Sequence, residues 1–170
     1  MSFDKAFAYT MKWEGGSKAT KDPDDPGGTT KYGISQRAHP NVDVENLTED
    51  EAKAIYLNEY WIPLGCEYIG GVIAAKLFDA GVNVGIGRAA ILAQQAFNDT
   101  LGPEEVGITP DGRIGHISID RISKVDPEKW LDAFETRLVN HYNYLVAKNV
   151  KNAKFLKGWI RRAESVPGAE

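Results

Sequence analysis

The sequence predicts a mainly α-helical protein of the α+β class, with a small β element close to the amino terminus. Apolar residues recur at helical spacing in several segments, most clearly from Trp130 to Leu145. Residues 17–35 are instead rich in Asp, Pro, Gly, Thr and Tyr, which is typical of turns and short strands. We therefore expect one small β-hairpin or β-rich loop in this segment and helices in most of the remaining chain.

The first helix is predicted to end beside an acidic residue. Apolar residues from Phe3 to Met11 share one face, and one further turn along this face reaches Glu14. Gly15 and Gly16 follow, and glycine readily adopts the left-handed conformation that ends helices. A carboxyl group is therefore expected at the inward edge of a helix end.

Local signals also predict where later helices begin. Thr48 followed by Glu51 is a capping box, which predicts a helix reaching about Trp61. Asp126 followed by Pro127 predicts the start of a long helix. The other helices are predicted around residues 73–81, 90–101 and 155–160, with a loop over residues 102–115.

Composition excludes several classes of protein. The 170 residues carry a net charge of −4, whereas general nucleic-acid binders are basic, so no nucleic-acid partner is expected. The single cysteine, Cys66, permits no internal disulfide and is predicted to be a small buried residue. The three histidines lack ligand spacing, so neither a metal nor another cofactor is predicted.

The sequence also predicts where the protein is made. Its first residues show no basic start followed by an apolar core, so no secretory signal is expected. The most apolar later stretch is interrupted by Lys76 and Asp79, and we expect no membrane insertion. The protein is therefore predicted to be made in the cytoplasm. A monomer is expected, because nothing in the sequence demands a larger assembly.

The acidic residues near the amino terminus suit the hydrolysis of a glycosidic bond. A carboxyl group that burial deprives of water favours its protonated form and can donate a proton near neutral pH. Glycosidic cleavage needs such an acid and a second group on the opposite face of the sugar. Glu14 is the candidate acid, and the loop containing Asp24 and Asp25 is the candidate source of the second group, with Thr30 beside it. The structural alternative is a solvated helix end followed by an ordinary surface turn.

The order of these motifs resembles a known family. "EGG" followed by "DPDDPGGTTKYGIS" resembles the glycoside hydrolase family 108 muramidases, which include phage endolysins and lysozyme-like proteins often labelled secretion activators. The later stretches "FDAGVNVGIGRAAILAQQAFN" and "KGWIRRA" resemble the peptidoglycan-binding domain that accompanies this family. The resemblance implies a lysozyme-like fold, with a catalytic segment over residues 1–64 and a peptidoglycan-binding segment over 65–170, packed as one globule.

The resemblance also implies an activity and residue roles. It implies cleavage of the β-1,4 bond between N-acetylmuramic acid and N-acetylglucosamine, with Glu14 as the general acid. By similarity to phage-type lysozymes, Asp25 and Thr30 position the attacking water, and Asp24 is the rival carboxylate. Attack by a positioned water would invert the anomeric centre, which requires carboxyl groups about 6.5–9.5 Å apart. This chain has Ser17 where the family commonly has an aromatic residue.

Three further residues are candidates for substrate binding. Tyr32 is a candidate for stacking on a sugar ring, and the alternative is simple packing. Asn83 is a candidate for binding an N-acetyl group, and the alternative is a helix cap. Gln94 is a candidate for lining a groove, and the alternative is ordinary surface. The "TPDGRIG" stretch is interpreted as a structural turn.

The expected partner is the glycan strand of peptidoglycan. Because no signal peptide is predicted, a holin or another export route would be needed to reach the cell wall. The alternative to an enzyme is a non-catalytic wall-binding or secretion-assisting protein with the same fold. A calcium-dependent interaction domain is less well supported, because prolines disrupt the ligand pattern of the acidic loop.

Overall fold

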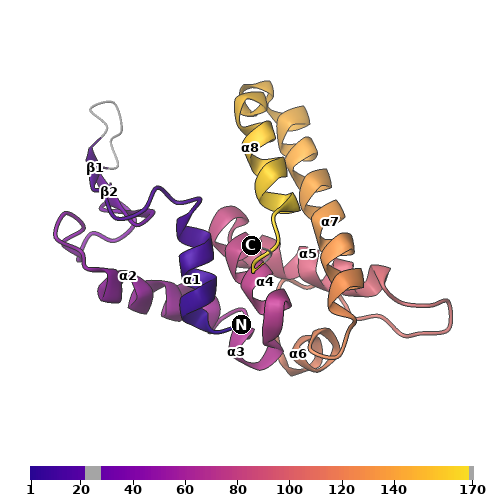
Figure 1. The fold of residues 1–170 in the computed structure, drawn as a ribbon. Coiled ribbons are helices and arrows are strands. Elements are labelled where there is room, and N and C mark those ends of the chain that lie inside the picture. Colours follow the sequence, from indigo (N-terminus) through magenta and orange to yellow (C-terminus); the bar gives the residue numbers. More distant parts are fainter. Residues whose placement is uncertain (22–27, 169–170) are drawn as a thin grey trace.

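The computed structural model describes residues 1–21 and 28–168, and the described part is mainly helical with a small sheet near the amino terminus (Figure 1). The fold class is therefore confirmed. The strands are β1 (Thr20–Lys21), β2 (Thr29–Lys31) and β3 (Ile34–Ser35). The helices are α1 (Phe3–Met11), α2 (Glu49–Tyr56), the π-helical turn η1 (Leu57–Trp61), α3 (Cys66–Ile69), α4 (Gly71–Val84), α5 (Ile86–Asp99), α6 (His116–Ile122), α7 (Pro127–Lys148), the 3₁₀ turn η2 (Val150–Asn152) and α8 (Ala153–Glu164).

The sheet is antiparallel, with β2 between β1 and β3. Lys31 pairs with Ile34, so only Tyr32 and Gly33 connect β2 to β3. Both residues have positive φ angles, 52° and 74°, as a two-residue turn of type I′ requires. The predicted hairpin is thus confirmed, and it contains a third strand that the composition did not indicate.

Both predicted helix caps are present. The Thr48 hydroxyl accepts from the backbone N–H of Glu51, whose carboxylate accepts from the backbone N–H of Thr48. The Asp126 carboxylate accepts from two backbone N–H groups of the first turn of α7, with Pro127 at the first helical position. Of the residues predicted to face inward from α7, Leu145 is only half-buried, because it lies near the carboxyl end of the helix. The short helices α3 and α6 were not predicted, since neither is long enough to show a clear period.

Helix α4 is the central element of the core. It packs against α1 and α3 as well as against α5 and α7, so a single buried cluster contains residues from both parts of the chain. Aromatic rings meet edge to face where α1 and η1 approach α4, as between Trp61 and Phe78. Two charged residues of α4, Lys76 and Asp79, are also buried.

Helices α7 and α8 pack against each other and extend together from the rest of the molecule (Figure 1). In the same view, α1 lies between the sheet and α4. Cys66 is free and buried, as predicted, and burial raises the pKa of its thiol. Within residues 1–21 and 28–168, we find no helix with the length and apolar character needed to cross a membrane.

Candidate active site

Glu14 lies in the turn that follows α1, as the sequence predicts. Backbone hydrogen bonds of the 3₁₀ type continue the helix as far as Trp13. Gly15 and Gly16 then adopt φ angles of 83° and 70°, which turn the chain away from the helix axis. The Glu14 side chain remains 21% exposed, so it lies at the protein surface without extending into bulk solvent.

The hairpin turn closes directly over this carboxyl group. A Cβ atom added to Gly33 would lie 3.0 Å from Glu14 Oε2 and 2.7 Å from the hydroxyl of Tyr56. That hydroxyl donates to the carbonyl of Tyr32 over 2.8 Å, and the backbone N–H of Tyr32 donates to the carbonyl of Gly16 over 3.1 Å. Glycine is therefore required at position 33 both for its φ angle and for its closeness to Glu14.

Arg162 of α8 binds the other oxygen of Glu14. Its Nη1 donates to Glu14 Oε1 over 2.7 Å, while its Nε and Nη2 donate to Asp79 over 3.0 and 2.9 Å. Burial alone would lower the pKa of Arg162, but the charges of Asp79 and Glu14 and the hydrogen bonds that they accept outweigh it and raise that pKa. One guanidinium thus connects three helical segments that are remote in the sequence.

A second buried cation supports the carboxyl end of α8. Lys76 Nζ donates to the backbone carbonyls of Arg162 and Ser165. Burial lowers the pKa of Lys76 to about 8, although the nearby Asp79 opposes the shift. Lys76 and Asp79 therefore hold the backbone and the side chain of Arg162, respectively.

Comparison with known proteins identifies both halves of the chain. Residues 7–85 match the model of the glycosyl hydrolase 108 family, and residues 89–164 match that of a Predicted Peptidoglycan domain. The chain joins a glycosyl hydrolase 108 domain to a peptidoglycan domain. The structure is similar to that of SagA from Brucella abortus, at 19% identity and a TM-score of 0.65, with 96% of each chain covered. No curated protein sequence matches the chain.

The two domains together indicate a lysozyme-like function directed at peptidoglycan, and the first indicates a glycoside hydrolase. The likeness to SagA supports the fold alone. The ion pair between Glu14 and Arg162 joins the two matched regions, because Glu14 lies in the glycosyl hydrolase 108 domain and Arg162 lies in the peptidoglycan domain.

The other residues predicted for the glycosyl hydrolase 108 domain have different positions. Asp24 and Asp25 lie outside the described residues. Thr30 lies in β2, partly exposed, and pairs with Thr20 of β1. Tyr32 forms the hairpin turn and is half-buried, with the Lys31 ammonium 5.9 Å from the centre of its ring. The ring also packs against the edge of the hydrophobic core, so both the backbone and the side chain of Tyr32 have structural contacts.

Asn83 and Gln94 differ in how much of each side chain is available. Asn83 is half-buried near the end of α4, where its Oδ1 accepts a 2.7 Å hydrogen bond from the hydroxyl of Tyr142. Gln94 is fully buried, and it donates to Asp111 and accepts from the backbone N–H of Gly112. We assign Gln94 to the support of the "TPDGRIG" turn, which corrects its placement in a groove.

Sequence reasoning missed the buried charges around Glu14. It predicted a carboxyl group that burial deprives of water, whereas the structure places the guanidinium of Arg162 against it. The available signal was the pair of charges in the otherwise apolar α4, Lys76 and Asp79. A charge in a buried helix needs a partner, and "KGWIRRA" supplied a candidate arginine.

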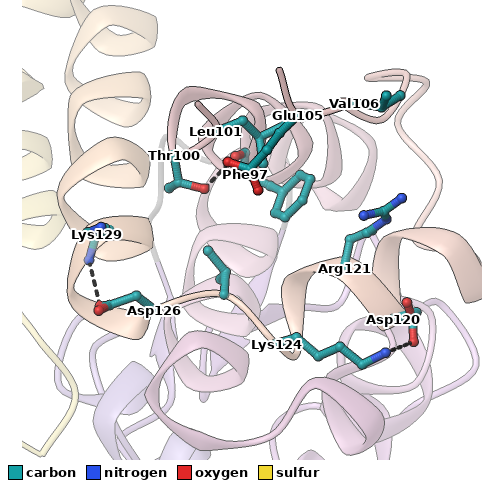
Figure 2. Close-up of a pocket in the computed structure, with 11 residues that line it drawn as sticks. Phe97, Thr100, Leu101, Glu105, Val106, Asp120, Arg121, Lys124, Asp126 and Lys129 are labelled. Atoms are coloured by element: carbon teal, nitrogen blue, oxygen red, sulfur yellow. Dashed lines mark hydrogen bonds and ion pairs between the residues drawn. The ribbon is translucent and has the colours of Figure 1, made fainter. Parts of the chain in front are cut away.

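A separate pocket of about 680 Å³ lies in the peptidoglycan domain, between the end of α5 and the start of α7 (Figure 2). Its charged groups include Lys124 and Asp120, which form an ion pair with each other. The lining includes none of the residues that surround Glu14, so this pocket is not part of the candidate site. It is lined by Phe97, Thr100, Leu101, Glu105, Val106, Asp120, Arg121, Lys124, Val125, Asp126 and Lys129.

Proposed function

We propose that the protein is an N-acetylmuramidase that cleaves the β-1,4 bond between N-acetylmuramic acid and N-acetylglucosamine. The observation that carries the proposal is the placement of Glu14, partly exposed and held between the hairpin turn at Gly33 and the guanidinium of Arg162. A carboxyl group fixed in this way can meet a glycosidic oxygen in one defined orientation.

Arg162 determines which oxygen of Glu14 can donate the proton. A guanidinium only donates hydrogen bonds, so Oε1, which it binds, must act as an acceptor. A protonated Glu14 would therefore carry its proton on Oε2, the oxygen that faces Gly33. The leaving glycosidic oxygen would reach Oε2 past the edge of the hairpin turn, because the space at Gly33 itself is too small for a methyl group. Arg162 is a positioning residue in this scheme, and Asp79 keeps its guanidinium in place.

Asp25 and Thr30 would position the attacking water, with Asp24 as the rival carboxylate. Thr30 lies in β2, one residue before Lys31, which ends the strand at the turn formed by Tyr32 and Gly33. Attack by a water positioned in this way would invert the anomeric centre. The protein needs no metal or organic cofactor for this chemistry, and an export route would bring it to the wall.

The test is the clearing of purified peptidoglycan by wild type and by Glu14→Gln, followed by measurement of new reducing ends. The amide oxygen that this substitution introduces can still accept from Arg162, so the variant should fold, while clearing should fall by about 10²–10⁴. Glu59→Gln is the matched control, because Glu59 is an exposed acid of the same domain, bound to His39 over 3.0 Å. Its activity should remain near that of wild type.

Other results would change the assignment. Equal clearing by wild type and Glu14→Gln would leave Glu14 as a structural ion-pair partner. Binding to peptidoglycan without clearing by wild type would favour the non-catalytic wall-binding alternative. Release of peptides without reducing ends would indicate an amidase or a peptidase. Substituting Asp25 and Asp24 separately by Asn identifies the second carboxylate.

A further inference from the structure

One face of α8 continues from the Glu14 site towards the amino end of the helix. Phe155, Gly158, Trp159 and Arg162 are spaced by three or four residues, so they share this face, which we call the aromatic face of α8. Arg162 at one end of it binds Glu14. A ligand that reaches Glu14 can therefore extend along the aromatic face without leaving the protein.

The aromatic rings on this face form a continuous stack. Trp159 stacks on the buried ring of Tyr142, with centroids 5.3 Å apart and planes inclined by 29°. Phe155 stacks on Trp159 at 5.7 Å and 30°, and it is 48% exposed. The ammonium of the exposed Lys154 lies 4.8 Å from the centre of the Phe155 ring, where an uncharged ligand could replace it. The stack is thus anchored in the core at one end and accessible at the other.

Asn83 adds a polar group beside this stack. The Tyr142 hydroxyl donates to Asn83 Oδ1, which fixes the orientation of the amide. Among the residues that the structure describes, none accepts a hydrogen bond from its Nδ2. Asn83 follows Asp79 by one turn of α4, so this amide lies on the same side of α4 as the residue that binds Arg162.

Gly158 has no structural explanation. Glycine is among the least favourable residues inside a helix, and Gly158 does not have a positive φ angle. A Cβ atom at this position would meet nothing within 4 Å, so close packing does not require glycine either. Its effect is to leave open space next to Trp159 on the aromatic face.

We propose that the aromatic face of α8, together with Asn83, is a binding surface for the uncharged N-acetylated sugar units of a glycan strand. Sugar rings present flat apolar C–H faces that stack on exposed aromatic rings, and an amide N–H can donate to an N-acetyl carbonyl or a hydroxyl. The missing side chain at position 158 gives a sugar ring access to Trp159. This inference rests on the proposed function for the identity of the ligand.

The test measures binding separately from turnover. All variants are made in the Glu14→Gln protein, and binding of an N-acetylglucosamine hexamer is followed by tryptophan fluorescence and calorimetry. Phe155→Ala should weaken binding about tenfold, the size of one lost stacking contact. Gly158→Leu should weaken it at least as much while raising the thermal midpoint, because leucine is a better helix former. A variant that is more stable but binds more weakly cannot be explained by damage to the fold.

Two matched controls carry similar changes elsewhere on the same helices. Tyr144→Ala removes an exposed ring of α7, and Lys157→Leu places leucine beside position 158 on another face of α8. Both should bind the hexamer as the parent does. Parental affinity in Phe155→Ala and Gly158→Leu would overturn the inference, even if the protein cleaves peptidoglycan. Weakened binding in these variants would support the surface, even if wild type releases no reducing ends.

Discussion

Replacing Arg162 by Met is expected to destabilise the protein strongly, because it leaves Asp79 without its partner. The side chains of Arg162 and Asp79 are only 7% and 4% exposed, so water cannot solvate the remaining carboxylate. Removing one member of a buried ion pair lowers the free energy of unfolding by about 3–5 kcal/mol. For a chain of this size, that loss lowers the thermal midpoint by roughly 6–20 °C. Glu14 contributes little to the loss, since it is exposed enough to be solvated.

The assay is urea unfolding of wild type, Arg162→Met and the double variant Arg162→Met/Asp79→Leu. The double variant removes both members of this buried ion pair, so it should recover most of the lost stability. It should not recover the clearing of peptidoglycan, because Glu14 still lacks the group that orients it. Arg162→Lys keeps the charge but not the two-pronged contact with Asp79, so its stability should lie in between.

The reasoning would be refuted by a small loss in Arg162→Met. A change below about 1 kcal/mol is typical of an exposed ion pair and would mean that Asp79 is solvated. A double variant no more stable than Arg162→Met would show that the loss comes from packing instead of from an unpaired charge. Full clearing by the double variant would remove Arg162 from the positioning of Glu14.

Two further predictions concern the hairpin turn and the buried lysine. In Gly33→Ala, the new side chain must adopt a φ of +74°, and its Cβ would lie 2.7 Å from the Tyr56 hydroxyl. We therefore expect thermal unfolding to show a free energy of unfolding lower by about 2–5 kcal/mol, and we expect most of the activity to be lost. The control is Gly28→Ala, which has a similar φ of +77° but only an ordinary 3.6 Å contact. It should lower the free energy of unfolding by roughly 1–2 kcal/mol and keep its activity. Equal effects of the two variants would contradict the close approach of Gly33 to Tyr56 and Glu14. Burial lowers the pKa of Lys76 from 10.5 to about 8, so between these values the unfolded chain holds a proton that the folded protein has released, and stability should rise with pH. In urea unfolding between pH 8 and 10, the free energy of unfolding of wild type should rise by up to about 1.4 kcal/mol per pH unit relative to that of Lys76→Met. If the stabilities of the two proteins change with pH in parallel, burial does not lower the pKa of Lys76.

The sequence predicted those parts of the site that depend on short-range signals. Gly15 and Gly16 mark the end of α1 because few other residues adopt their backbone angles. Threonine and tyrosine before Gly33 indicated a hairpin, and the structure adds that its turn covers Glu14. In each case the residues that give the signal also form the feature, within a few positions of one another.

The remaining features depend on contacts between distant residues. Arg162 is 148 positions from Glu14 and 83 from Asp79, and no local pattern pairs them. The charges of α4 were interpreted only as evidence against a membrane span, although their burial requires a buried partner. Gln94 shows the same limit, because its hydrogen bonds go to a turn that follows it by 17 residues or more. A periodic pattern can indicate that a position is buried but not which group it meets.

The ion pairs of Arg162 make the two matched domains depend on each other. Asp79 and Glu14 belong to the first domain, and both are bound by one side chain of the second. Without α8, Asp79 would be left unpaired and Glu14 would lose the donor that fixes Oε1. The same helix carries the aromatic face, and Phe155 lies two helical turns from Arg162, a distance of about 10 Å. A glycan bound to α8 would therefore have a fixed position relative to Glu14, because one rigid helix holds both the sugar and the acid. If Glu14 donates the proton and α8 binds the glycan, as we propose, the peptidoglycan domain completes the catalytic site of its neighbour as well as binding the substrate.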